Sequence, residues 1–192
     1  MNNVDLVLRN FNSHIETIES VRNILTEQII TIANVMAQSL SNGGSIFWCG
    51  NGGSAADSQH LAAELVGRFK NNRRALRSIA LTTDSSVLTC IANDYSYDDI
   101  FARQVEALGR PGDLLIGIST SGNSENVLRA LKTAKEFNLV TVALLGKGGG
   151  SVKDLADHAL VIPSDSTARI QEAHILIGHI FCELIEQELS LA

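Results

Sequence analysis

The chain has 192 residues, of which 45% are hydrophobic, 5% aromatic and 19% charged, and its formal net charge is −6 with a sequence pI near 5.3. This length suffices for one substantial hydrophobic core and is short for two, so we expect a single domain over residues 1–192. The acidic balance and the few aromatic residues argue against a nucleic-acid-binding surface, and no apolar run reaches the roughly 20 residues that span a bilayer, so we expect a cytoplasmic protein without nucleic-acid or membrane partners.

The N-terminal segment, residues 1–40, is predicted to form one long helix or two. Its apolar side chains recur at helical spacing, at Val4, Val7, Leu8, Phe11, Ile15, Ile18, Ile24, Leu25, Ile29, Ile32, Val35, Met36 and Leu40. A helix ahead of the first strand has little sheet of its own to cover. We therefore expect residues 1–40 to be used in oligomerisation, with the α/β core in residues 41–192.

Residues 45–64 (SIFWCGNGGSAADSQHLAAE) pass from an apolar run through a glycine-rich turn into an alanine-rich helix. The run 45–49 is typical of a strand buried on both faces, and the glycines after it let the backbone turn sharply. Ser54 is expected to cap the helix. Unpaired N–H groups and the helix dipole favour negative charge at such a helix N-terminus, so a phosphorylated ligand is the first inference.

The rest of the chain alternates between strands and helices. Strands are expected at residues 78–82, 114–118, 139–145 and 159–162, and helices at 84–92, 98–108, 125–137, 152–156 and 167–189, with a turn at Asn93-Asp94. Strands separated by helices predict a five-stranded parallel sheet between two helical layers, which is a three-layer α-β-α sandwich. In such sheets ligands bind at the carboxyl ends of the strands.

The third predicted strand runs directly into a hydroxyl-rich loop, residues 119–124 (STSGNS), which precedes a helix. Neutral hydroxyl donors together with a helix N-terminus can hold a phosphate monoester without a lysine. An ordinary serine-rich helix cap is the alternative, but one or two hydroxyls would suffice for capping. The four hydroxyls of Ser119, Thr120, Ser121 and Ser124 therefore favour a phosphate site.

A dinucleotide site is a second interpretation of the first turn, because Gly50, Gly52 and Ala55 match the G-x-G-x-x-A spacing. The acidic residue that would hold a ribose should follow about 20 residues later. The basic segment 70–77 occupies that region instead, and the G-K-[S/T] of a nucleotide P-loop is also missing. No nucleotide cofactor is therefore expected.

The cysteines of the chain are Cys49, Cys90 and Cys182. They lie among apolar neighbours and lack the C-x-x-C spacing of zinc or redox sites. All three are expected to be reduced core residues.

His60 and Glu64 are four residues apart on the predicted helix, so they share one face about 6 Å apart and can serve one site. The pair suits a metal dyad, an acid/base pair or a solvated interaction. On the C-terminal helix, Gln171 and His179 lie in an otherwise apolar run and are also candidates. His174 points elsewhere on that helix and is expected to be a hydrogen-bonded packing residue.

The length of the helix that carries His60 and Glu64 limits what one substrate can touch. Glu64 is ten residues beyond Ser54 and therefore roughly 15 Å further along the helix axis. Either the substrate is extended, with its phosphate at residues 119–124, or a neighbouring subunit completes the pocket.

Four segments, GNGGSAADSQHLAAEL, AND, GISTSGNSENV and ARIQEAHILIGH, together resemble the sedoheptulose 7-phosphate isomerases (phosphoheptose isomerases) of the SIS sugar-isomerase fold. The resemblance covers nearly the whole chain and implies a flavodoxin-like SIS sandwich. The implied reaction converts sedoheptulose 7-phosphate to D-glycero-D-manno-heptose 7-phosphate through an enediol, early in the route to the ADP-heptose of lipopolysaccharide core or capsule. A homotetramer with shared active sites is implied too, with one zinc ion per subunit in some members.

Position by position, the resemblance implies Glu64 as the general base and His179 as its acid/base partner. The implied zinc ligands are His60, Glu64, Gln171 and His179. The implied substrate-binding positions are Asn51, Gly52, Gly53, Ser54, Glu64, Asn93, Asp94, Ser119, Thr120, Ser121, Ser124 and Gln171, with Arg68 as a secondary candidate. Ala168 departs from relatives that carry an acidic residue there, so a sugar contact is expected to be missing or supplied by Asp165.

The implied chemistry agrees with these residue types. Moving a proton between C1 and C2 requires one base near both carbons and an acid for the oxygens, which a carboxylate and a histidine can supply. His, Glu and the less common ligand Gln could hold zinc, which would polarise the carbonyl. A carboxylate that coordinates zinc tightly is not a free base, so the two roles of Glu64 compete.

Two other classes are alternatives. SIS relatives that bind the bacterial replication initiator share the fold and the tetramer but typically lack the carboxylate that corresponds to Glu64. Glu64, Gln171 and His179 therefore favour an enzyme over this non-catalytic interaction protein. Phosphosugar-sensing regulatory SIS modules are normally attached to a further domain, for which 192 residues leave little room.

Overall fold

The computed structural model describes residues 2–190. In chain order its elements are α1 (Asn3–Ser41), β1 (Ile46–Gly50), α2 (Gly53–Val66), β2 (Ser78–Ala80), α3 (Ser85–Asp94), the 3₁₀ helix η1 (Tyr97–Asp99), α4 (Ala102–Leu108), β3 (Leu114–Ser119), α5 (Glu125–Glu136), β4 (Val140–Leu145), the 3₁₀ helix η2 (Lys147–Val152), β5 (His158–Val161) and α6 (Thr167–Glu188). Strands and helices alternate through the chain, as the sequence predicts.

The strands form one parallel sheet in the order β2-β1-β3-β4-β5. This confirms the predicted five-stranded sheet. The order of the strands reverses at β1: β2 lies on one side of it, and β3, β4 and β5 follow on the other. β1 and β3 pair along the whole of β1, up to Gly50 opposite Ile118. At such a switch point the loops after the two strands diverge and open a crevice at the carboxyl edge of the sheet.

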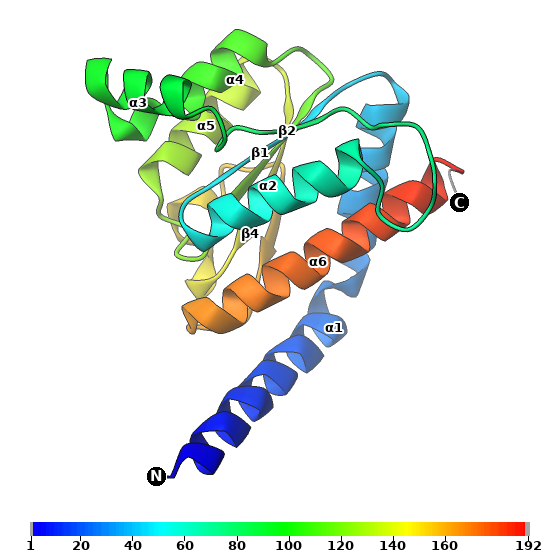
Figure 1. Cartoon of the computed structure of the whole chain (residues 1–192), viewed down its shortest axis with the longest axis vertical. Coiled ribbons are helices and arrows are strands. Elements are labelled where there is room, and N and C mark those ends of the chain that lie inside the picture. The colour runs from blue at the N-terminus through cyan, green and yellow to red at the C-terminus, as the bar shows by residue number, and fades with distance from the viewer. Residues whose placement is uncertain (1, 191–192) are drawn as a thin grey trace.

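Side chains along each strand alternate between two hydrophobic cores, because successive residues of a strand point to opposite faces. Trp48 and Ile116 belong to the core shared with α1, α2 and α6, whereas Phe47 and Leu115 belong to the core shared with α4 and α5. Figure 1 shows the same layers, with α2 and α6 on one side of the sheet and α4 and α5 on the other. The molecule is therefore the predicted α-β-α sandwich.

Helix α1 is continuous over 39 residues, but its two ends have different surroundings. From Val21 to Leu40 one face of the helix is buried in the core, through Val21, Leu25, Ile29, Ile32, Met36 and Leu40. The first part, residues 3–16, projects from the body of the molecule in Figure 1, and we call it the N-terminal arm. Apolar side chains of the arm, among them Leu8 and Phe11, are 53% and 62% exposed.

The start of α2 differs from the prediction. Gly52, rather than Ser54, is the N-cap residue, and its φ of 56° is a conformation that glycine adopts without steric cost. Ser54 lies inside the helix and is 3% exposed, with its carbonyl accepting a hydrogen bond from the Ser58 hydroxyl at 2.8 Å. The prediction that Ser54 caps this helix is therefore wrong.

Other boundaries also differ. Asn93 and Asp94 are the last residues of α3 rather than a turn. The predicted helix 98–108 is divided into η1 and α4, and residues 152–156 form no α-helix. Residues 148–150 lie within η2, where all three glycines have positive φ.

Cys49 and Cys182 are buried free thiols, as expected, but Cys90 is exposed because α3 has no buried residue. The prediction of a buried Cys90 is wrong. Within residues 2–190, none of the helices is long and apolar enough to cross a membrane.

Candidate active site

Two loops leave the sheet side by side at the switch point. The turn 51–54 follows β1 and the loop 119–124 follows β3, and these two strands are hydrogen-bonded neighbours. Both loops lead directly into helices, α2 and α5, so two helix N-termini face the same edge of the sheet. Unpaired N–H groups and helix dipoles at this edge favour an anionic ligand.

The hydroxyls of the loop 119–124 converge. The Ser119 Oγ lies 2.9 Å from the Ser124 Oγ and 3.5 Å from the Ser121 Oγ. Ser124 is the N-cap residue of α5, yet its side chain makes no capping hydrogen bond. The alternative of an ordinary serine cap therefore does not account for this hydroxyl, and the cluster is suited to accept a phosphate.

An amide pair ties the two loops together. The Asn51 Nδ2 donates to the Asn126 Oδ1 at 2.9 Å, and the Asn126 Nδ2 donates to the Asn51 Oδ1 at 2.8 Å. Tyr97 adds a third bond, because its hydroxyl donates to the Asn51 Oδ1 at 3.0 Å. Asn126 is 2% exposed, so this pair fixes the turn 51–54 relative to the first turn of α5.

Helices α2 and α6 pack against each other with their axes running in the same direction. Gly178 permits this close approach, because a Cβ there would lie 2.5 Å from the Leu61 Cδ1. At the beginning of α2, Gly53 faces Gln171 in the same way, with a built Cβ 2.6 Å from the Gln171 Nε2. The packing brings the candidate residues of the two helices together, although they are far apart in the sequence.

One result of this packing is a cluster of three side chains, which we call the triad: His60, Glu64 and His179. Their ligand atoms all lie within 4.8 Å of one another. The His60 Nε2 is 3.0 Å from the His179 Nε2 and 3.3 Å from the Glu64 Oε1. His60 is exposed, and Glu64 and His179 are half-buried, so the triad is accessible to a ligand.

The geometry of the triad fits a zinc ion. Two ligand atoms at about 2.0 Å from a tetrahedral zinc are about 3.3 Å from each other. The separations of 3.0 and 3.3 Å within the triad are close to this value. Two histidines and one carboxylate are also a donor set of catalytic zinc sites, which keep a fourth position open.

Gln171 is not part of the triad within one chain. It packs against Gly53, at the end of α2 that carries the turn 51–54. His179 follows Gln171 by eight residues on α6, which corresponds to about 12 Å along the axis. The structure therefore brings Gln171 to the predicted substrate turn rather than to His60 and Glu64.

Two neighbours of the triad, Asp57 and Phe69, are absent from the sequence prediction. Asp57 lies one helical turn before His60; burial raises the pKa of its carboxyl above the usual value, and the nearby His60 and His179 lower it again. Its Oδ2 is buried and has no hydrogen-bond partner among residues 2–190. Phe69 stacks on the His179 ring at a centroid distance of 5.5 Å. The sequence offers one signal for Asp57: it lies three residues before His60 and seven before Glu64, so it shares their helix face.

Cys182 is a buried residue of α6, three positions after His179. Burial raises the pKa of its thiol to about 12, and the Glu64 carboxylate adds to this effect. The thiol is therefore protonated at neutral pH, as is typical of an unreactive buried cysteine.

His174 is a packing residue, as the sequence predicts. It is 0% exposed, and its Nε2 donates a hydrogen bond to the carbonyl of Leu145 at 3.1 Å. Burial lowers the pKa of its imidazole to about 4, because the charged form loses hydration. His174 is therefore neutral at physiological pH and holds α6 against β4.

Asn93, Asp94 and Arg68 are not brought to the other candidates by hydrogen bonds among residues 2–190. Asn93 and Asp94 are exposed and bonded to each other, with the Asn93 Nδ2 2.8 Å from the Asp94 Oδ1. Arg68 is also exposed and donates only to the carbonyl of Lys70, at 3.4 Å.

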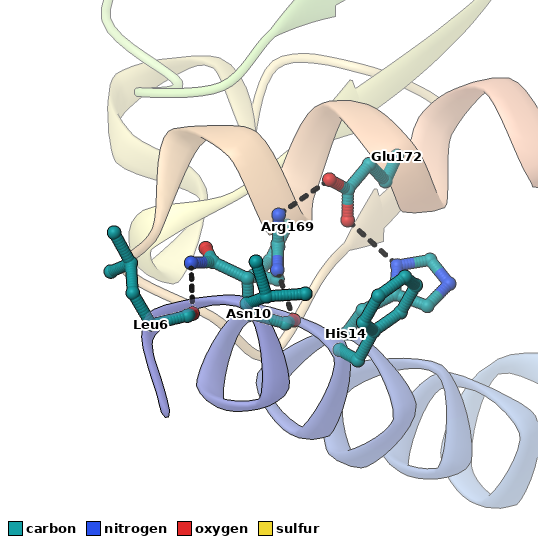
Figure 2. Close-up of a pocket in the computed structure, with 7 residues that line it drawn as sticks. Leu6, Asn10, His14, Arg169 and Glu172 are labelled. Carbon is teal, nitrogen blue, oxygen red and sulfur yellow. Dashed lines mark hydrogen bonds and ion pairs between the residues drawn. The ribbon is translucent and has the colours of Figure 1, made fainter. Parts of the chain in front are cut away.

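The start of α6 is anchored to the N-terminal arm beside the site. Figure 2 shows Arg169 between Asn10 and Glu172, with His14 beyond Glu172. The Arg169 guanidinium donates to the Asn10 carbonyl and to Glu172, and Glu172 pairs with the His14 Nδ1 at 2.6 Å. Arg169 is 8% exposed, so the residue two positions before Gln171 is fixed to α1.

Comparisons with known proteins agree over nearly the whole chain. The profile of the SIS domain matches residues 10–146. Phosphoheptose isomerase 1 of Campylobacter jejuni is 54% identical over 184 residues, which cover 96% of this chain and 98% of that protein. Among solved structures, a phosphoheptose isomerase of Neisseria gonorrhoeae is 46% identical with a TM-score of 0.93, and one of Francisella tularensis is 39% identical with a TM-score of 0.95. Each of these two comparisons covers 97% of this chain and 100% of the other.

Proposed function

The chain belongs to the phosphoheptose isomerase family of SIS-domain proteins, and from this membership we propose that it converts sedoheptulose 7-phosphate to D-glycero-D-manno-heptose 7-phosphate. The identity of about half of all residues extends over nearly the full length of the relatives. The non-catalytic interaction protein is not favoured, since the carboxylate that distinguishes the enzymes is present as Glu64.

The observation that carries the mechanism is the contact of α2 with α6, which brings Glu64 and His179 into one triad. In the proposed reaction the Glu64 carboxylate takes a proton from C1 of the ketose and returns it to C2, while His179 moves protons at the oxygens. The hydroxyls of residues 119–124 hold the phosphate. The turn 51–54 and Gln171 hold the sugar hydroxyls, with Asn93, Asp94 and Arg68 completing the pocket.

We propose zinc as the metal of the triad, held by His60, Glu64 and His179, with the fourth position left to water or the substrate rather than to Gln171 of the same chain. When bound, zinc would polarise the substrate carbonyl and stabilise negative charge on its oxygen. The roles of Glu64 as ligand and as base compete for the same carboxylate. Both roles are compatible if Glu64 binds zinc weakly, so that water replaces its carboxylate at the metal while it acts as the base.

The reaction is tested by incubating the purified protein with sedoheptulose 7-phosphate in D₂O and following the products by NMR. We expect the aldose to appear with deuterium at C2, because a carboxylate base exchanges its proton with solvent before returning it. No aldose in the presence of added zinc would contradict the proposed function. Aldose formed without any deuterium would contradict an exchanging base.

The role of zinc is tested by removing metal with a chelator and then restoring single metals. We expect activity to fall on removal and to return with Zn²⁺, together with one bound zinc per chain by elemental analysis. Mg²⁺ serves as the control, because it prefers oxygen ligands and an octahedral site. Unchanged activity in metal-free protein would leave zinc without a catalytic role.

We also propose that the N-terminal arm joins copies of the chain into a homotetramer with shared active sites. Val4, Leu8, Phe11 and Ile15 are 52% to 65% exposed at spacings of three and four residues, and their row continues the one that is buried from Val21 onward. A hollow of about 480 Å³ lies between the arm and α6. Exposed apolar faces of this kind mark protein–protein contacts.

The proposed compartment is the cytoplasm, where the three free thiols would stay reduced. There the aldose product would enter the synthesis of ADP-heptose for lipopolysaccharide core or capsule.

A further inference from the structure

A buried ion pair lies behind the triad, between the segment that follows α2 and the end of α6. The Arg73 Nε is 2.8 Å from the Glu186 Oε1, and the two side chains are 1% and 2% exposed. A buried pair of this kind adds little net stability compared with well-packed apolar residues, because both charges lose their hydration. Stability alone therefore does not account for it.

Arg73 holds the backbone of the proposed base. Its Nη2 donates to the carbonyl of Glu64 at 2.9 Å, and its Nη1 donates to the carbonyl of Leu65, also at 2.9 Å. These carbonyls are in the last turn of α2, where no further N–H of the helix is available to them. The planar guanidinium thus fixes the end of α2 at Glu64 itself.

Glu186 holds the other side of the triad. Its carboxylate accepts hydrogen bonds from the backbone N–H groups of Phe69 at 3.0 Å, Lys70 at 3.2 Å and Asn71 at 3.2 Å. The Phe69 ring stacks on the His179 ring with an interplanar angle of 20°. The Glu186 carboxylate thereby fixes the ring against which His179 rests.

The charge state of Glu186 supports this arrangement. Burial raises the pKa of its carboxyl, but the N–H groups of Phe69, Asn71 and Lys70 and the Arg73 guanidinium outweigh this and hold the pKa below the usual value. The carboxylate is therefore ionised at neutral pH and remains an acceptor for all of these donors.

We propose that Arg73 and Glu186 are positioning residues for the triad, one fixing the backbone of Glu64 and the other fixing Phe69 against His179. The inference rests on the proposed function only through the assignment of the triad as the reactive site. Residues that orient ligands or catalytic groups typically change metal affinity or activity about 10- to 100-fold when they are replaced. Neither Arg73 nor Glu186 needs to touch the substrate for this effect.

The test compares Arg73→Lys and Glu186→Gln with wild type. Lysine keeps the positive charge beside Glu186 but lacks the fork that reaches the Glu64 and Leu65 carbonyls, and glutamine keeps the shape of Glu186 without its charge. We expect the ring NMR signals of His60 and His179 to shift in metal-free, ¹⁵N-histidine-labelled protein. We expect zinc affinity, measured by competition with a chromophoric chelator, and kcat each to fall about 10- to 100-fold. KM should change less, because residues 119–124 are not touched.

Glu183→Gln is the matched control. Glu183 is on the same helix and pairs with Lys70 of the same segment at 2.6 Å, but its side chain is 54% exposed. We expect this variant to keep wild-type ring signals, zinc affinity and kcat. If Arg73→Lys and Glu186→Gln only lower the melting temperature and leave these three quantities as in wild type, the pair is structural and the inference is overturned.

The failure of this inference is distinguishable from a failure of the proposed function. Ring signals and zinc affinity are measured without turnover, so they decide the positioning role even if the protein does not isomerise the heptose. If wild type binds no zinc, the ring signals of the metal-free protein decide it alone. Arg73→Lys keeps both charges of the pair, so it provides folded protein for the comparison even if Glu186→Gln unfolds.

Discussion

At the residue scale, the proposed base is the side chain with the most direct consequence. Glu64 is at the end of α2, its side chain is 26% exposed, and its carboxylate contacts His60 at 3.3 Å. Glu64→Gln keeps the shape and removes the basic oxygen. We expect kcat to fall by about 10²- to 10⁴-fold, the usual contribution of a general base. Steady-state kinetics on sedoheptulose 7-phosphate measure this, and a kcat within twofold of wild type would contradict the assignment.

Because the Glu64 side chain is partly exposed and glutamine has the same shape, the Glu64→Gln replacement should leave the fold intact. The melting temperature and the elution volume of the Glu64→Gln variant are the controls, and both should match wild type. If the variant unfolds or dissociates, its lower kcat does not report on the role of Glu64 as a base.

His174 gives a pH dependence at the same scale. The pKa of its imidazole is about 4 in the folded protein, against an ordinary value of 6.5. Below pH 6.5 the His174 imidazole binds a proton in the unfolded chain but stays neutral in the folded protein. The free energy of unfolding therefore decreases as the pH falls from 6.5 toward 4. The loss amounts to about 3 kcal/mol of unfolding free energy.

His174→Gln tests this, because glutamine can also donate to the Leu145 carbonyl but does not titrate. Urea unfolding at pH 7, 5.5 and 4, at one protein concentration, should show a flatter pH dependence for the variant than for wild type. Equal slopes for the two proteins would mean that His174 is not the titrating group.

At the scale of elements, the amide pair between the turn 51–54 and α5 sets the relative position of the two ligand-binding loops. Asn126→Ala removes both bonds to Asn51, of 2.8 and 2.9 Å, and leaves the Asn51 amide partly unpaired. We expect about 1–3 kcal/mol less stability and a KM raised about tenfold, because the turn no longer keeps its place beside the phosphate loop.

Tyr97→Phe is the milder companion of this change. It removes only the hydroxyl that donates to Asn51 at 3.0 Å, from a side chain that is 59% exposed. Its effect on KM should be smaller than that of Asn126→Ala, and its melting temperature should match wild type. A KM for Asn126→Ala within twofold of wild type would show that the pair does not position the substrate turn.

The elements themselves were largely predictable, and their ends were not. Residues 45–49 and 114–118 are apolar runs that only a buried strand explains well, and both are strands within one residue of the expected range. The start of α2 was missed because its N-cap is a positive-φ glycine without a capping side chain, which a search for Ser or Asp cannot find. Asn93 and Asp94 continue α3, where Asp84 caps the helix by accepting from the N–H of Val87.

At the scale of the whole molecule, the N-terminal arm predicts the assembly. Phe11 is 62% exposed within one chain, so Phe11→Glu should change the stability of that chain by less than about 0.5 kcal/mol. If the arm joins copies, a buried unpaired charge will dissociate them. Light scattering coupled to size-exclusion chromatography should show a smaller particle, with activity lost wherever the site is shared.

Arg9→Glu is the control for the arm, because Arg9 lies on its polar side with Asp5 and Glu16. The particle mass of this variant should be that of wild type. If Phe11→Glu also keeps the wild-type mass, the arm is not the contact between copies.

The sequence alone determined the parallel sheet, its ligand-binding edge and the residue types of the site. Strand and helix patterns are local, and the hydroxyls of residues 119–124 and the pair His60 and Glu64 lie within single turns or loops. The tertiary structure decided which helices meet. The packing of α2 against α6 at Gly178 joins His179 to His60 and Glu64, and the buried pair of Arg73 and Glu186 links the end of α2 to the end of α6. Such contacts depend on the depth of a groove and on distant partners, which spacing along one helix does not encode.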